Sequence, residues 1–154
     1  MSPEPAIAAD LVIGALIKGA ILAMILIALA HVLRRNRREI LFASLLVAAL
    51  AYVLFAVRAQ AGAGWIIVEL IGLAIYGGIG WRGVRGSIWW LASAWALHPL
   101  WDIALHYFGP GVSFVHPLRY PVPCVSFDLV VATYLGYLAS RESTSPRTYQ
   151  PPIL

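Results

Sequence analysis

The stretch ILFASLLVAALAYVLFAV, residues 40–57, would be apolar around its whole circumference as a helix. A surface helix of a soluble protein would carry a polar face, and a strand of a membrane barrel would alternate apolar and polar residues. A second run of the same kind, AILAMILIALAHVL, covers residues 20–33. Since a helix satisfies its own backbone hydrogen bonds in lipid, these runs predict an all-α integral membrane protein.

The composition of the whole chain agrees with these two runs. Its 154 residues are 61% hydrophobic and only 12% charged. One crossing needs about 20 apolar residues, so the chain has room for about five crossings and no separate soluble domain. We expect one five-helix domain over residues 1–140, with spans at 7–33, 39–58, 64–81, 87–108 and 123–140. Residues 141–154 are polar and rich in proline, which predicts a disordered cytoplasmic tail.

Basic residues are distributed unevenly between the loops. Those on one side are Arg34, Arg35, Arg37, Arg38, Arg82, Arg85, Arg141 and Arg147, and those on the other are Arg58 and Arg119. Because cytoplasmic loops carry the excess of Lys and Arg, we expect the N-terminus outside and the C-terminus in the cytoplasm, in the inner (plasma) membrane of a bacterium. Membrane orientation accounts for the net charge of +4, so no nucleic-acid partner is expected.

The segment ALHPLWDIALH, residues 96–106, places ionisable side chains inside an apolar run. His98, Asp102 and His106 recur every four residues and therefore share one face of a helix. From the expected orientation, Asp102 lies roughly 9 Å and His98 roughly 15 Å below the outer surface. Glu69 and Asp128 fall in the same outer half on neighbouring spans. Ionised groups at such depth usually pair with one another or with an ion, so we expect these five to converge.

Two kinds of chemistry suit such a cluster. The candidate acid/base residues are Asp102, His98, Glu69 and Asp128, and the candidate ligands of a divalent metal are His106, Asp102, Glu69 and Asp128. His98 and His106 are about 12 Å apart along the helix axis, so one ion would take Asp102 and only one of them. Zinc, iron and magnesium all stay open. A cation- or proton-coupled transport protein and a purely structural polar cluster are the alternatives.

Aromatic residues flank this cluster. Trp95 and Trp101 each stand three residues from His98, and such rings could stabilise a developing carbocation. Lys18 lies at a similar depth, and His116 falls in the segment GPGVSFVHPLRYPVP, residues 109–123, which we expect to be an ordered, non-helical outer cap. The expected partner is a membrane lipid or apolar small molecule, isoprenoid or sterol-like. A homo-oligomer stays open, and a single cysteine excludes an intrachain disulfide.

The pattern H-x-x-W-D-x-x-x-H at residues 98–106 follows Glu69 and precedes C-x-x-x-D at residues 124–128. This arrangement resembles a family of small bacterial and fungal membrane proteins known only as a domain of unknown function. The resemblance covers roughly residues 60–135, and the first two spans match only in being apolar. It implies that the five ionisable residues are motif positions, and it implies no particular activity.

Overall fold

The computed structural model describes residues 4–33, 36–113, 115 and 118–144. Its elements are α1 (Glu4–Val32), α2 (Arg37–Arg58), α3 (Ala63–Arg85), α4 (Ile88–Asp102), the π-helix η2 (Ile103–Tyr107), the 3₁₀ helix η3 (Pro110–Ser113) and α5 (Pro121–Thr144). The described part of the chain contains no strand, so the predicted all-α fold is confirmed.

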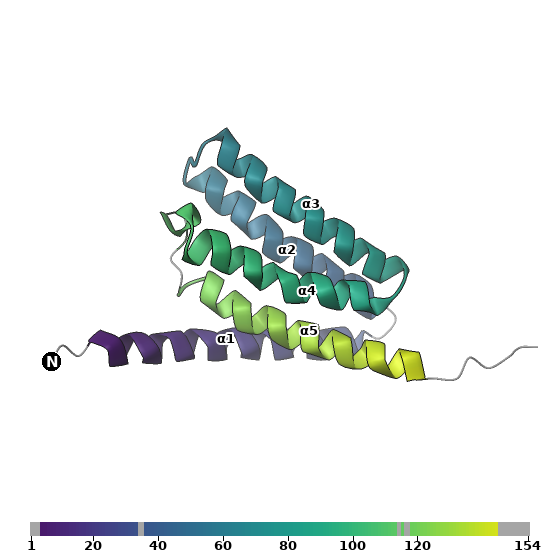
Figure 1. Ribbon diagram of the computed structural model, residues 1–154. Coiled ribbons are helices and arrows are strands. Elements are labelled where there is room, and N and C mark those ends of the chain that lie inside the picture. Colours follow the sequence, from purple (N-terminus) through teal and green to yellow (C-terminus); the bar gives the residue numbers. More distant parts are fainter. Residues whose placement is uncertain (1–3, 34–35, 114, 116–117, 145–154) are drawn as a thin grey trace, which may run out of the picture.

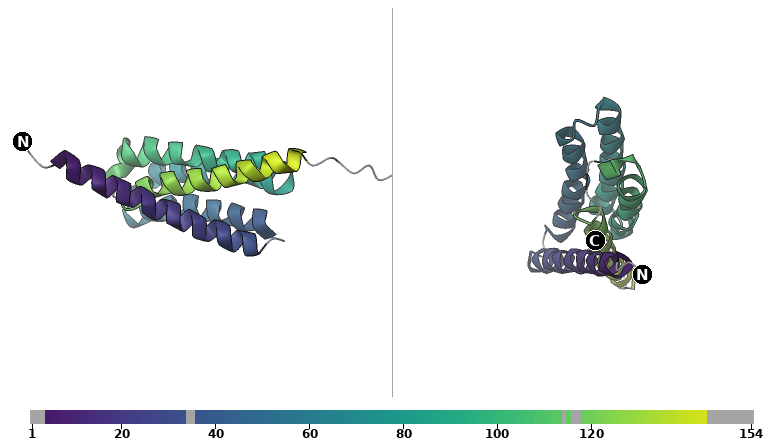
Figure 2. Two further views of the ribbon diagram at one scale, coloured as in Figure 1. Left: turned by 90° about the horizontal axis from the view of Figure 1, so that it is seen from below. Right: turned by 90° about the vertical axis from the view of Figure 1, so that its left-hand side faces the viewer.

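The five α-helices form a bundle in which α2 to α5 run antiparallel to their sequence neighbours, whereas α1 packs on α5 and runs in the same direction as α5 (Figure 1). α2 packs on α3, α3 on α4, and α4 on α5, while α1 lies obliquely along α5 (Figure 2). The contact between α1 and α2 is much weaker than these. The start of α1 and the end of α5 lie at opposite ends of the bundle (Figure 1).

Four helices are long and apolar enough to cross a membrane, namely α1, α2, α3 and α5. α4 has only 15 residues, but it continues without a break into the 5 residues of η2. Large apolar side chains cover the outside of the bundle. Examples are Ile25, Val47 and Leu100, which are 60%, 67% and 60% exposed. Such an extended apolar surface is unusual for a soluble protein.

The expected spans each fall on one helix, but the boundary at the fifth was wrong. Residues 109–123 were expected to be non-helical, whereas they contain η3 and the first turn of α5. Pro121 and Pro123 fit there because backbone N–H groups in a first helical turn have no partner within the helix. α5 also continues to Thr144, so residues 141–144 are helical and not part of a disordered tail. Residues 145–154 of that expected tail lie outside the described residues.

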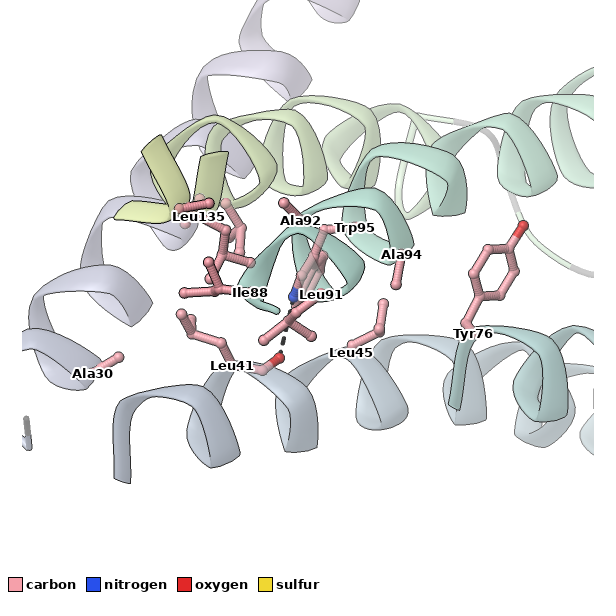
Figure 3. Packing of buried hydrophobic residues seen from close by; sticks show 13 residues of the cluster. Ala30, Leu41, Leu45, Tyr76, Ile88, Leu91, Ala92, Ala94, Trp95 and Leu135 are labelled. Atoms are coloured by element: carbon pink, nitrogen blue, oxygen red, sulfur yellow. Dashed lines mark hydrogen bonds between the residues drawn. The ribbon is translucent and has the colours of Figure 1, made fainter. Parts of the chain in front are cut away.

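The apolar core occupies the half of the bundle that contains the starts of α2 and α4. Leu41 and Leu45 from α2 meet Leu91 and Trp95 from α4, together with Leu135 from α5 (Figure 3). All five are fully buried, and the Trp95 Nε1–H donates a hydrogen bond to the Leu41 carbonyl oxygen at 3.2 Å. This indole bond ties α2 to α4 directly below the polar residues described next.

Glycines on α3 set the distance to its neighbours at three positions, one of them Gly83, where a Cβ would collide with the backbone of Leu91 on α4. A Cβ on Gly72 would collide with the ring of Trp101, and one on Gly80 would collide with the ring of Phe42. Small residues of this kind let neighbouring helices approach closely. Gly78 has open space around it and contributes nothing to the packing.

Candidate functional site

All five ionisable residues that the sequence singles out lie together inside the bundle. Glu69 on α3, His98 and Asp102 on α4, His106 on η2 and Asp128 on α5 are each at most 2% exposed. Exposed charges are the norm on a helical bundle, and five buried ionisable groups in one place need an explanation in their mutual contacts.

His98, Asp102 and Asp128 form the first group. The His98 Nδ1 lies 2.8 Å from an oxygen of Asp128 and 3.8 Å from an oxygen of Asp102, its neighbour one turn along α4. One potential ligand atom from each of the three side chains lies within 4.8 Å of the others. The second Asp128 oxygen and both Asp102 oxygens have no hydrogen-bond partner. These three residues are therefore a set of possible metal ligands whose hydrogen-bonding capacity is not fully used.

Glu69 and His106 form the second group. The His106 Nε2 lies 3.3 Å from one Glu69 oxygen, although the alignment does not make a hydrogen bond. The other Glu69 oxygen accepts a hydrogen bond from the Trp101 Nε1–H at 3.4 Å. Both His106 ring nitrogens lack a hydrogen-bond partner in the described part of the chain.

The backbone of α4 changes its winding within the site. Pro99 removes the N–H that would bond to the carbonyl of Trp95, and four residues later the chain enters the π-helix η2. The Phe108 N–H then donates to the Ile103 carbonyl, five residues earlier, at 3.0 Å. Single π-helical turns occur frequently at functional sites because they reorient side chains without ending the helix. Here the turn carries His106.

Tyrosines that the sequence reasoning missed enclose the two histidines. The ring of Tyr52 stacks on His106, with centroids 4.0 Å apart and planes inclined by 17°. Tyr76 meets His98 edge to face at 5.1 Å, and Tyr120 meets Tyr52 edge to face at 5.3 Å. The Tyr52 hydroxyl also approaches the Asp102 carboxyl group without hydrogen-bond geometry. Tyr52 and Ser44 are the two hydroxyl-bearing residues of α2, and a hydroxyl group inside an apolar span is the sequence signal that could have identified Tyr52.

Trp101 and Trp95, both expected in the pocket, take different places. Trp101 lies beside Glu69 and Tyr76, with the two aromatic centroids 6.1 Å apart. Trp95 instead belongs to the apolar core, where it contacts Phe127 and bonds to α2. It was placed in the pocket because it stands three residues before His98, but that distance puts it one helical turn deeper in the bundle.

Lys18 and His116 are not brought to the cluster. Lys18 is exposed on α1, and no ion pair joins it to an acid among the residues that the structure describes. Its neighbour Gly19 packs against Pro123 and Ser126 of α5, so Lys18 faces away from the bundle. The expected place of His116 lies outside the described residues. Lys18 was expected at the pocket because of its position along the helix, but its side chain is exposed on α1.

The donor set of the first group fits a divalent metal. Zinc binds His nitrogen and carboxylate oxygen at about 2.0–2.2 Å, so two ligand atoms on one ion are at most about 4.4 Å apart. The 4.8 Å within which these ligand atoms fall exceeds that limit by only a few tenths of an ångström. Three protein ligands with a free fourth position are typical of catalytic zinc sites. His98 replaces His106 as the histidine that accompanies Asp102 and Asp128.

Comparison with known proteins identifies a family but no activity. No curated protein and no solved structure matches the chain. A family model described as "Family of unknown function (DUF6010)" matches residues 14–142. This match begins far earlier than residue 60, so it includes the first two helices, which the sequence resemblance did not cover. The chain belongs to this family of unknown function.

Proposed function

We propose that the chain crosses the membrane five times, with its N-terminus outside and its C-terminus in the cytoplasm of a bacterium. Four helices of sufficient length and the continuous helical segment 88–107 support this number. The opposite positions of the two helical ends fit an odd number of crossings. With this orientation, the basic loops face the cytoplasm and the polar cluster lies in the outer half of the bilayer.

Within this arrangement, the protein is an intramembrane enzyme that performs acid/base or metal-assisted chemistry on a lipid-like substrate. One observation carries the proposal: three buried ligand atoms from His98, Asp102 and Asp128 lie within 4.8 Å of one another, while three carboxylate oxygens of that group have no hydrogen-bond partner. A cluster that served only to hold helices together would be expected to satisfy its own hydrogen bonds.

In the metal-assisted form, the His98 Nδ1 and one oxygen each from Asp102 and Asp128 are the ligands. A bound divalent ion would act as a Lewis acid and lower the pKa of a coordinated water. Glu69, held by Trp101, and His106, held under Tyr52, are then placed to move protons beside it.

In the metal-free form, the Nδ1–H of His98 donates to Asp128, which fixes the tautomer and orientation of the imidazole. Asp102 is then the free carboxyl group that accepts or donates a proton. The two forms exclude each other because the same Nδ1 cannot both carry a proton and bind a metal. Metal content therefore decides between them.

The surroundings favour an apolar substrate. The void bordered by Tyr52, Tyr76, Trp101 and His98 is too small to hold a water molecule. Aromatic faces around buried acids could stabilise a positively charged transition state on an isoprenoid or sterol-like molecule. Such a molecule would reach the cluster from the bilayer and would have to displace one of these rings.

Metal analysis of the purified protein tests this proposal. The protein is purified in mild detergent without chelator, and bound metals are measured by mass spectrometry alongside His98→Ala and the control His31→Ala, which changes an exposed residue of α1. Near-stoichiometric metal that is lost only in His98→Ala supports the metal-assisted form. A metal-free protein that catalyses proton exchange or rearrangement of prenyl lipids supports the acid/base form.

Transport is the alternative from another class. Uptake of a cation or of protons into proteoliposomes, abolished by His98→Ala, would replace the enzymatic proposal. The fully buried apolar residues beneath the cluster, Leu41, Leu91 and Trp95 among them, offer no polar path in the described part of the bundle.

A further inference from the structure

A second cavity, separate from the polar cluster, lies between α1, α2 and α5. Its volume of about 580 Å³ is within the range of small-molecule sites, about 300–1,000 Å³. It occupies the place where the bundle is most loosely joined, because α1 contacts α2 only weakly. At its edge, Leu22 and Val47 are 57% and 67% exposed, so the cavity opens to the outer surface of the bundle.

The walls of this cavity have a polar end and a long apolar end. Leu26, Ile40 and Phe127 line the apolar part. Along α2 the lining residues run from Ile40 to Ala48, a length of about 12 Å. Ser44 also lines it, but its hydroxyl already donates to the Ile40 carbonyl oxygen at 2.9 Å. An extended hydrocarbon chain matches this part of the cavity.

Arg119 and Tyr120 line the end of the cavity that lies just before α5. Arg119 is exposed and forms no ion pair with any acid that the structure describes. An unpaired guanidinium at the wall of an otherwise apolar cavity is suited to a phosphate or carboxylate head group.

One layer of side chains separates this cavity from the polar cluster. Tyr120 and Cys124 line the cavity, and the ring of Tyr120 meets Tyr52, which in turn stacks on His106. Cys124 stands one helical turn before Asp128 on α5, so the two share a helix face. A movement of the two tyrosine rings would join the cavity to the cluster.

We propose that this cavity binds a single anionic lipid, with its chain along α2 and its head group on Arg119, and that it presents this lipid to the cluster as the substrate. The assignment as substrate rests on the function proposed above, whereas the binding does not. The lipid chemistry follows from the order of the walls: one cation at the polar end and hydrocarbon along the rest.

Photocrosslinking tests the binding directly. The full chain is placed in nanodiscs of phosphatidylcholine with oleyl monophosphate that carries a diazirine in its chain, or with the matching uncharged alcohol. We expect the phosphate probe to label peptides of α1 and α2 that line the cavity. Arg119→Gln should weaken its labelling roughly tenfold or more, since it removes a hydrogen bond to a charged group. Arg58→Gln, at the other outer arginine, should leave labelling unchanged.

Three further variants keep the test decisive. Ala43→Trp fills the cavity and should abolish labelling, whereas Ala28→Trp, on an exposed position of α1 that does not line the cavity, should retain it. Asp102→Asn should bind the probe like the wild type, because it alters only the cluster. Equal labelling by the alcohol, or labelling that Arg119→Gln does not change, would mean that bulk lipid fills the cavity and would overturn the inference. A variant that loses metal or activity but still binds the probe would bear on the proposed function and would leave the lipid-binding inference standing.

Discussion

Replacement of Asp102 by asparagine should change the stability of the protein in opposite directions with and without metal. Asp102 is fully buried, and neither of its oxygens has a hydrogen-bond partner. A second carboxyl group, Asp128, shares His98 with it. Asparagine has nearly the same shape and no charge, so the substitution creates no cavity and removes a buried carboxyl group whose ion pair with His98, at 3.8 Å, is shared with Asp128.

In chelator the variant should be at least as stable as the wild type. A buried polar group without a partner costs about 1–3 kcal/mol, and more when it is charged. The Asp102→Asn protein avoids the charged part of this cost, so a gain of about 1 kcal/mol in the free energy of unfolding is the expected order.

With a divalent metal the order should reverse. A ligand present at 100 times its dissociation constant stabilises the folded state by about 2.7 kcal/mol. The wild type offers three protein ligands and should gain this amount, whereas the variant offers two charged or imidazole ligands and should gain much less. The wild type is then the more stable protein by roughly 1–2 kcal/mol, from the difference of these two terms.

The measurement is unfolding by SDS in mixed micelles, followed by tryptophan fluorescence, for both proteins with chelator and with added zinc. Asp10→Asn, which changes an exposed acid on α1, is the control and should follow the wild type in both conditions. If Asp102→Asn is clearly less stable than the wild type in chelator, the carboxyl group is a structural contact, and the reasoning from its unsatisfied oxygens is wrong.

Three further predictions concern contacts within the bundle, each measured by the same unfolding assay. Gly111→Ala should destabilise the protein by about 1–3 kcal/mol, because its Cβ would meet the ring of His106, whereas Gly78→Ala, in open space within α3, should be stabilising by up to about 1 kcal/mol. Tyr52→Leu should lower the free energy of unfolding by about 0.5–1.5 kcal/mol beyond the loss expected from its smaller buried area, because the stack on His106 is lost. Tyr52→Phe keeps the ring and should not show this additional loss. Arg38→Gln breaks a half-exposed ion pair to α5 at 2.7 Å and a hydrogen bond to the Gly86 carbonyl oxygen at 2.8 Å. It should cost about 1 kcal/mol, and high salt should remove only the part of this cost that comes from the ion pair.

The helices could be predicted from the sequence because hydrocarbon imposes a strong and simple constraint. A run such as residues 40–57 has no other stable structure in lipid, and the helix indeed extends from Arg37 to Arg58. The π-helical turn could not be predicted, since it depends on how the end of α4 meets its neighbours. Pro99 indicated a disturbance but not its kind or its position four residues later.

The candidate site was predictable as a set of residues but not as an arrangement. Spacing on one helix correctly placed His98, Asp102 and His106 on a shared face, and depth correctly added residues from α3 and α5. Which histidine accompanies which acid depends on the rotation of each helix, and this is set by contacts such as that between Gly72 and Trp101. Tyr52 was missed for a related reason: an aromatic residue in an apolar span is ordinary for a membrane helix.

The surroundings of the oxygens that lack hydrogen bonds indicate from which side an ion, a proton or a substrate group would reach them. Below the cluster, Trp95 uses its only donor on the Leu41 carbonyl oxygen, and the leucines around it offer nothing polar. Above the cluster, the helix η3 packs its Gly111 against His106, and Tyr120 borders both the site and the cavity between α1, α2 and α5. An ion, a proton or a substrate group that satisfies Asp102 would therefore arrive past the tyrosine rings at the η3 and α5 end of the bundle. A substitution that narrows this entrance should slow metal exchange without changing the metal content at equilibrium. A change in the leucine core should leave both the exchange rate and the metal content unchanged.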